Sequence, residues 1–222
     1  MIDKPTQLAL DLRYRTAVGR EDFLVSPSNA EAVAWVDRWP DWPSSTVLLV
    51  GPPGCGKTHL GQVWREAANA VEYEGDETVL AMDSGPRVFV DNTEYGNRDQ
   101  EILHLFNNVV SAGGYLLFAV TTPPVRWKKR LPDLTSRLSA APNIRIHSPD
   151  EKLVAAVMVK MFADQKLGVS TEVLDYLLNR MERSFEAARN LVGLLNNASL
   201  ENRRGITIPL ARQVFEEMAK KS

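Results

Sequence analysis

Residues 51 to 58 read GPPGCGKT and combine three glycines with a lysine and a threonine. This order matches the phosphate-binding P-loop, in which glycines let backbone N–H groups turn toward phosphate oxygens. Lys57 can reach the β- and γ-phosphates, and the Thr58 hydroxyl can hold Mg²⁺. The motif predicts a site for a nucleoside diphosphate or triphosphate. The predicted contacts are Pro52, Pro53, Gly54, Cys55, Gly56, Lys57, Thr58 and His59.

The residues on both sides of this loop are of the kinds that a P-loop requires. Residues 46–50 are apolar and β-branched, which is typical of a buried strand, and residues 59–67 have the pattern of a helix. A strand before the loop and a helix after it are the context that gives the motif its meaning. The alternative, a glycine-rich turn without a ligand, is disfavoured by these two flanks.

A second acidic motif follows in the apolar run 87–91, which ends in an aspartate. Asp91 resembles the aspartate of a Walker B strand, which binds Mg²⁺ directly or through water. The alternative is an aspartate that caps the end of a strand. Asn92 stands where hydrolytic proteins of this kind place a carboxylate, and an amide can orient water but cannot accept its proton. We therefore expect little intrinsic hydrolysis, and the sequence leaves open whether the chain is an enzyme.

The remaining pattern predicts an α/β fold with a second, helical part. A helix is expected at about 98–111 and another apolar strand at 115–120, and alternating helices and apolar strands indicate a parallel sheet buried on both faces. Beyond residue 149 the apolar residues recur at helical spacing. We predict an extended tail at 1–22, an α/β nucleotide-binding domain at 23–149 and a helical domain at 150–222.

Composition narrows the class of protein. The chain has 222 residues, a net charge of −2 and one cysteine, Cys55, so an internal disulfide is excluded. No stretch has the roughly 18 apolar residues of a membrane span, and no signal peptide is evident. These features predict a cytoplasmic protein that does not associate with membranes.

The motifs in their order resemble the AAA+ ATPases, in the branch that contains the replication initiator DnaA and most closely its Hda group, the regulatory inactivators of that initiator. The resemblance implies a helical lid after the α/β domain, with ADP or ATP and Mg²⁺ as ligands. The matching segments are FLVSPSN at 23–29, the P-loop, FVDN at 89–92, LFNN at 105–108, LPDLTSRL at 131–138 and RNLVGLL at 189–195.

The resemblance also implies roles for residues outside the P-loop. Arg137 would be an arginine finger that reaches the nucleotide of a neighbouring subunit, and Arg189 would be the sensor-2 arginine of the lid. The alternatives are a surface ion pair for Arg137 and the polar face of a helix for Arg189. Sensor 1 would be Thr121 or Thr122, and the sequence does not decide between them. The adenine pocket would be lined by Phe23, Leu24 and Val25.

Two departures from the initiators bear on function. The stretch between the P-loop helix and Asp91 is too short for the helices with which initiators engage DNA, and no helix-turn-helix domain follows the lid. The resemblance therefore implies a switch that contacts DNA only indirectly. The basic run 126–130 leaves direct DNA contact as one interpretation and a solvated loop as the other.

The tail contains QLALDL at 7–12, which resembles the peptide that docks on the β sliding clamp of DNA polymerase III. An extended peptide can place a glutamine in a polar subsite and leucines in an apolar groove. The alternative is an edge strand packed on its own domain, since the leucines alternate. The predicted clamp-binding residues are Gln7, Leu8, Leu10 and Leu12.

Three functions compete. The leading hypothesis is a nucleotide-bound regulator that docks on the clamp and uses Arg137 to stimulate ATP hydrolysis by DnaA. The second is an autonomous ATPase that loads or remodels a replication protein, against which Asn92 argues. The third is a degenerate scaffold that binds only the clamp, which the intact Gly56, Lys57 and Thr58 disfavour. The sequence leaves open whether ADP or ATP is the working ligand and whether the chain forms a homodimer or a higher oligomer.

Overall fold

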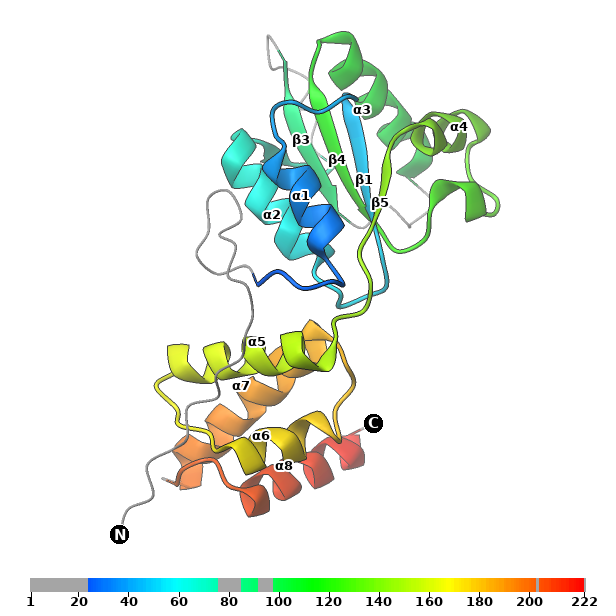
Figure 1. Ribbon diagram of the computed structural model, residues 1–222. Helices are drawn as coiled ribbons and strands as arrows, with labels where there is room; N and C mark the ends of the chain where they lie inside the picture. The colour runs from blue at the N-terminus through cyan, green and yellow to red at the C-terminus, as the bar shows by residue number, and fades with distance from the viewer. Residues whose placement is uncertain (1–23, 76–84, 92–97, 203, 222) are drawn as a thin grey trace. The chain divides into compact units, whose positions relative to one another are not determined.

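The computed structural model describes residues 24–75, 85–91, 98–202 and 204–221 (Figure 1). Phe23, Asn92 and the 7–12 motif lie outside these residues. The described chain divides into two compact units, the first ending at Ser148 and the second beginning at Pro149. Among the described residues, no helix is both long and apolar enough to cross a membrane.

A parallel five-stranded sheet forms the centre of the first unit. The strand order is β2-β3-β4-β1-β5, so the P-loop strand lies between β4 and β5. The two outermost strands are short, and the three inner strands are apolar and mostly buried, as a sheet covered on both faces requires. The strands are β1 (Thr46–Val50), β2 (Val71–Glu72), β3 (Arg87–Asp91), β4 (Tyr115–Val120) and β5 (Asn143–Arg145).

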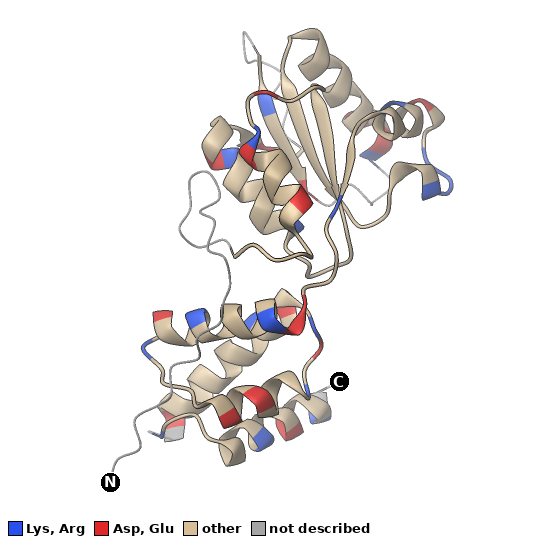
Figure 2. Cartoon of the chain, viewed as in Figure 1, with Lys and Arg blue, Asp and Glu red and all other residues tan. Residues whose placement is uncertain are grey.

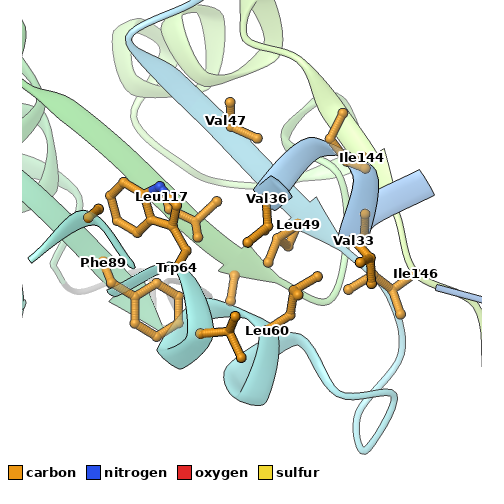
Figure 3. Close-up of a cluster of buried hydrophobic side chains, with 14 of the residues drawn as sticks. Val33, Val36, Val47, Leu49, Leu60, Trp64, Phe89, Leu117, Ile144 and Ile146 are labelled. Atoms are coloured by element: carbon orange, nitrogen blue, oxygen red, sulfur yellow. The ribbon is translucent and has the colours of Figure 1, made fainter. Parts of the chain in front are cut away.

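Alternate side chains of each inner strand enter two separate hydrophobic cores. One core joins Leu49, Phe89 and Leu117 to helices α1 (Ala30–Asp37) and α2 (Lys57–Ala68), and Figure 3 shows these side chains in one cluster with Leu60 and Trp64 of α2. The other core contains Leu48, Val90 and Phe118 and is covered by the helices α3 (Asp99–Ser111) and α4 (Pro132–Ala140). A short 3₁₀ turn, η3 (Pro124–Arg126), precedes α4.

Helix α2 lies very close to the sheet at Gly61. A Cβ built on Gly61 would be 2.1 Å from the Phe89 ring, so only glycine allows this approach. One turn later, Trp64 is fully buried and stacks on Trp42 with ring centroids 5.2 Å apart. The contact between Gly61 and Phe89 therefore sets how closely α2 approaches β3.

The second unit is a four-helix assembly with its own core. Its helices are α5 (Glu151–Asp164), α6 (Thr171–Leu178), α7 (Phe185–Asn202) and α8 (Ile208–Lys221). Met158, Phe162 and Leu177 are among the buried core residues. The Asp150 side chain caps α5 by accepting a hydrogen bond from the Leu153 amide, and the Ser170 side chain caps α6 by accepting one from the Val173 amide.

The predicted fold class is confirmed: a parallel sheet flanked by helices precedes a helical C-terminal part. The sequence pattern did not predict β2, β5 or α4. β5 has three residues and buries only Ile144, so it has no periodicity to detect and exists through its pairing with β1.

Candidate functional site

The P-loop leaves β1 at the carboxyl edge of the sheet, where its shape depends on glycine at three positions. Gly54 and Gly56 have φ of 68° and 100°, values that other residues rarely adopt. A Cβ on Gly51 would be 2.3 Å from the carbonyl oxygen of Ile146. Pro52, Pro53 and Cys55 complete the loop, and the Gly51 amide donates to Val120 O at 3.1 Å, which ties the loop to β4.

Lys57 begins α2 and folds its side chain back into the loop. Its Nζ donates to the carbonyl oxygens of Gly51 and Pro52, both at 2.8 Å, and the residue is 9% exposed. Nζ also lies 3.9 Å from the Cys55 Sγ. Burial raises the pKa of the Cys55 thiol, and nearby Lys57 offsets only part of this effect. The ammonium is therefore held where phosphate oxygens could replace the two carbonyls as its partners.

Thr58 and Asp91 meet at the same edge. The Thr58 hydroxyl donates to the Asp91 Oδ2 at 2.7 Å, although the residues are 33 positions apart in sequence. A hydroxyl and a carboxylate at hydrogen-bond distance are the oxygen ligands that Mg²⁺ takes beside a bound phosphate. These residues fit Mg²⁺, which when bound would polarise phosphate oxygens. The predicted pair of metal ligands is thus brought together.

The sensor-1 candidates directly follow β4. Val120 ends the strand next to Gly51, so Thr121 and Thr122 lie at the P-loop edge of the sheet. The Thr122 carbonyl oxygen accepts a hydrogen bond from Trp127 Nε1 at 2.8 Å. Both threonines are half-buried, and the choice between them stays open.

Of the predicted adenine-pocket residues, Leu24 and Val25 are described. The Asn29 side chain holds this segment: its Nδ2 donates to the Leu24 carbonyl oxygen at 3.0 Å, and its Oδ1 accepts a hydrogen bond from the Ser26 backbone amide at 2.9 Å. Asn29 is 2% exposed. Nothing in the sequence pattern assigned this role to Asn29, whose two partners precede it in the chain. His59, on α2, is half-buried.

Arg137 lies on α4 with 42% of its side chain exposed. Its Nε donates to Asp133 Oδ1 at 3.0 Å, and its guanidinium lies 5.8 Å from the centroid of the Phe106 ring on α3. The ion pair is the kind that the alternative interpretation expected, and half of the side chain still faces solvent. Arg189 is an exposed residue of α7 in the second unit, next to the buried Ala188.

The basic run 126–130 is not a uniformly solvated loop. Arg126, Lys128 and Lys129 are exposed and form no ion pair with any described residue, and Figure 2 shows consecutive basic residues before α4. Arg130, in contrast, has a side chain only 7% exposed that pairs with Asp99 of α3. The solvated-loop interpretation is therefore wrong for Arg130. The sequence missed Asp99, whose partner is 31 residues away.

A hollow of about 160 Å³ lies elsewhere, at the opposite edge of the sheet where β1 and β4 begin. Its lining includes Trp42, Tyr115 and Val110, with no charged side chain among the residues that form it. A phosphate would find no counter-charge there. The P-loop edge remains the candidate site.

Comparison with known proteins shows what the chain is similar to. Residues 150–215 match the family model "Hda, lid domain". The chain is 27% identical to the chromosomal replication initiator protein DnaA of Caulobacter vibrioides, over 89% of this chain and 46% of the initiator, so it spans under half of that relative. It is 25% identical to an uncharacterised protein of Haemophilus influenzae over 74% of this chain and 79% of that protein.

Solved structures agree in fold. Domain III of the Thermotoga maritima replication initiation protein DnaA superimposes with a TM-score of 0.74 at 18% identity, over 89% of this chain and 95% of that one. A replication initiator DnaA bound to AMPPCP and single-stranded DNA gives 0.66 at 18% identity, over 82% and 67%. The lid match and these likenesses together support a DnaA-related AAA+ protein with an Hda-like lid.

Proposed function

We propose that this chain is a regulator of replication initiation that binds an adenine nucleotide with Mg²⁺ at the P-loop edge. In this proposal residues 7–12 dock on the β sliding clamp, and Arg137 stimulates ATP hydrolysis by DnaA. The observation that carries the proposal is the combination of a formed P-loop edge with a lid that matches the Hda lid domain. The likeness to an initiator bound to AMPPCP supports the choice of an adenine nucleotide.

The nucleotide part of the proposal rests on charge and hydrogen bonding. Lys57 would exchange its two carbonyl partners for phosphate oxygens, and the Thr58 hydroxyl and Asp91 would turn from each other to Mg²⁺. Arg189 would contact the phosphates from the lid, and one of Thr121 and Thr122 would contact the γ-phosphate. ADP and ATP both fit these contacts, and the nucleotide that co-purifies with the protein would distinguish them.

The activating part of the proposal rests on Arg137. A guanidinium stays charged at all working pH values and offers a planar set of donors to the charge that develops during phosphoryl transfer. Arg137 is half-exposed, and its partner Asp133 is itself 52% exposed, so solvent screens this pair. A weak surface pair can be exchanged for a phosphate contact at little cost. Arg137 is therefore available to a partner's nucleotide.

The test is the conversion of DnaA-bound ATP to ADP in the presence of DNA-loaded clamp. We expect Arg137→Ala to bind nucleotide and clamp normally and to lose about 10³-fold or more of the stimulation, the worth of a finger in comparable systems. Arg137→Lys should fail as well, because an ammonium lacks the planar fork. Arg183→Ala is the matched control, since Arg183 also forms an exposed ion pair, with Glu151 at 2.6 Å. Full ADP formation with Arg137→Ala would exclude the finger.

Clamp docking is tested separately, because Gln7, Leu8, Leu10 and Leu12 lie outside the described residues. Replacing both Gln7 and Leu8 by alanine removes an anchoring amide and an apolar contact, each worth about 2 kcal/mol at a typical hot spot. We expect the double variant to lose co-elution with the clamp and to keep its nucleotide. If the double variant still co-eluted with the clamp, the docking role would be wrong and the edge-strand interpretation of the leucines would be favoured.

An autonomous ATPase remains the second candidate, because the Thr58–Asp91 pair is intact. Asn92 lacks the carboxylate that would take a proton from water, so we expect the isolated protein to turn over far more slowly than about 1 per second. Asn92→Asp should raise this rate. Wild-type turnover in the ordinary enzymatic range would favour the second candidate over the first.

A further inference from the structure

Helix α4, which carries Arg137, is short and buries few of its side chains. It has nine residues, and Leu134 and Leu138 are its two fully buried side chains. Within the described part of the chain, no side chain caps its N-terminus by a hydrogen bond. Two buried side chains one turn apart hold a short helix against a core, and the contacts at the ends of the helix then decide its orientation.

Asp99, at the start of α3, supplies the missing contact. Its Oδ2 accepts the amide of Leu131, the residue just before α4, at 2.7 Å, and its Oδ1 accepts the Arg130 Nε at 2.6 Å. The Arg130 Nη2 lies 2.5 Å from the same Oδ1. The two side chains are 7% and 10% exposed, so the pair is sheltered from solvent. One carboxylate therefore links the N-terminus of α3 to the N-terminus of α4.

Arg130 extends this link toward the P-loop edge. Its guanidinium lies 4.3 Å from the centroid of the Trp127 ring, and Trp127 Nε1 donates to Thr122 O at 2.8 Å. The series Asp99, Arg130, Trp127 and Thr122 thus joins α3 to the end of β4. The start of α4 is therefore linked to two elements: to α3 through Asp99, and to the residues that follow β4 through Trp127 and Thr122.

The charge on Asp99 survives burial because several groups stabilise it. Burial by itself would raise the pKa of the Asp99 carboxyl, but the hydrogen bonds from Arg130 and from the Leu131 amide outweigh it and hold this pKa below its ordinary value. Asp99 is also the first residue of α3, and its carboxylate accepts the amide that precedes α4, so two helix N-termini favour its negative charge. The link therefore persists at all physiological pH values.

The direction of Arg137 depends on how α4 lies on α3. Asp133, its ion-pair partner, is on α4, whereas Phe106, whose ring it approaches, is on α3. A tilt of α4 would move Arg137 away from Phe106 while keeping Asp133. We infer that Asp99 and Arg130 are positioning residues that hold α4 in the orientation from which Arg137 reaches a partner's nucleotide. This inference rests on the proposed function.

Two variants and one control test the inference. Arg130→Met removes the ion pair. Asp99→Asn removes the charge but keeps the size of the side chain and an acceptor for the Leu131 amide, so it can still test the inference if Arg130→Met does not fold. Arg183→Met is the control, because it breaks an exposed ion pair in the other unit. The measurements are nucleotide affinity, amide hydrogen exchange along α4 and β1, the Nε–H signal of Arg137 in NMR, and stimulation of DnaA.

We expect both variants to bind nucleotide within about twofold of wild type and to exchange the α4 amides tenfold or more faster while β1 is unchanged. The Arg137 Nε–H signal should shift, because the Phe106 ring current changes, and stimulation should fall tenfold or more. Arg183→Met should change none of these. A role in stability alone would lower protection in β1 and α4 together and leave the Arg137 signal of the folded protein in place.

The outcomes separate this inference from the proposed function. If wild type stimulates DnaA and both variants match it, the positioning inference is wrong and the proposed function stands. If wild type does not stimulate DnaA, the proposed function fails, and α4 exchange and the Arg137 signal still decide whether the pair positions Arg137. Unchanged exchange and an unmoved signal in both variants overturn the inference whatever the stimulation result.

Discussion

The P-loop and helix α4 position their functional side chains in different ways. In the P-loop, the strand, the glycines, Lys57 and Thr58 are consecutive in sequence, and positive φ at Gly54 and Gly56 fixes the shape locally. On α4, Arg137 depends on Asp99 through Arg130 and Leu131, and 31 residues separate Asp99 from Arg130. One element is specified by its own sequence, the other by a distant carboxylate.

This difference predicts how each element responds to substitution. A change inside the P-loop removes a ligand contact directly and leaves the rest of the molecule in place. A change at Asp99 or Arg130 removes no ligand contact and acts through the orientation of a helix. If the two elements are independent, a P-loop variant should lower nucleotide affinity without changing amide exchange in α4. A variant at Asp99 or Arg130 should change amide exchange in α4 without lowering nucleotide affinity.

The largest expected effect is at Lys57. Lys57→Ala removes a charged donor that is 9% exposed, and charge-assisted contacts of about 1.5–3 kcal/mol each are lost, so nucleotide affinity should fall by about 100-fold or more. Calorimetry with ADP and ATP measures this loss. Lys152→Ala, on an exposed position of α5, is the matched control and should bind as wild type. Loss of α4 protection in Lys57→Ala would show that the two elements are coupled.

The next effect tests a distant contact of the P-loop helix α2, its close approach to β3. Gly61→Val would add a branched side chain at a position where a Cβ alone would be 2.1 Å from the Phe89 ring, and overpacking of this kind costs about 1–3 kcal/mol. We expect a lower urea midpoint together with weaker nucleotide binding, because α2 must move away from β3 and takes Lys57 with it. An unchanged midpoint would show that Phe89 relocates without cost.

The sequence predicted the parts of the molecule whose patterns are local. The apolar strands at 46–50, 87–91 and 115–120, the P-loop and the helical lid follow from periodicity and from a contiguous motif. β5 was missed because it buries one side chain and is stabilised by pairing with β1. Arg130 looked like one cation in a solvated run, because nothing near it in sequence points to Asp99. Pairings between distant residues leave no periodic signal.

A smaller effect in the opposite direction is expected at a second helical glycine. Gly193 lies inside α7, and a Cβ added there meets nothing within 4 Å among the described residues. Gly193→Ala should therefore raise the free energy of unfolding by about 0.4–1 kcal/mol, since alanine restricts the unfolded chain and favours helix. Thermal unfolding of this variant beside Gly61→Val compares a tolerant and an intolerant helical glycine. A destabilised Gly193→Ala would reveal a contact that forms outside the described residues.

The smallest effect concerns a more exposed cluster at the start of α3, formed by Tyr73, Arg98 and Glu101. Tyr73 donates its hydroxyl to Glu101 Oε1 at 2.6 Å, and Arg98 pairs with the same carboxylate at 2.7 Å. Partial burial, with the hydrogen bond to Glu101 and its negative charge, raises the pKa of Tyr73 to about 12. The folded protein therefore keeps the phenol proton at pH values where the unfolded chain, with an ordinary pKa of about 10, has lost it. Its contribution to stability is full below about pH 10 and declines as pH rises toward about 12.

Because Arg98 and Glu101 are about 40% exposed, solvent screens this cluster, and we expect only a modest alkaline slope. Urea midpoints of wild type and Tyr73→Phe, measured between about pH 9 and 11.5, should converge as pH rises, since only wild type has the phenol to lose. Glu101→Gln should reduce the slope by removing the carboxylate that holds the proton. Parallel midpoint curves for wild type and Tyr73→Phe would show that loss of the phenol proton costs the folded protein no stability, so that the carboxylate of Glu101 does not hold this proton.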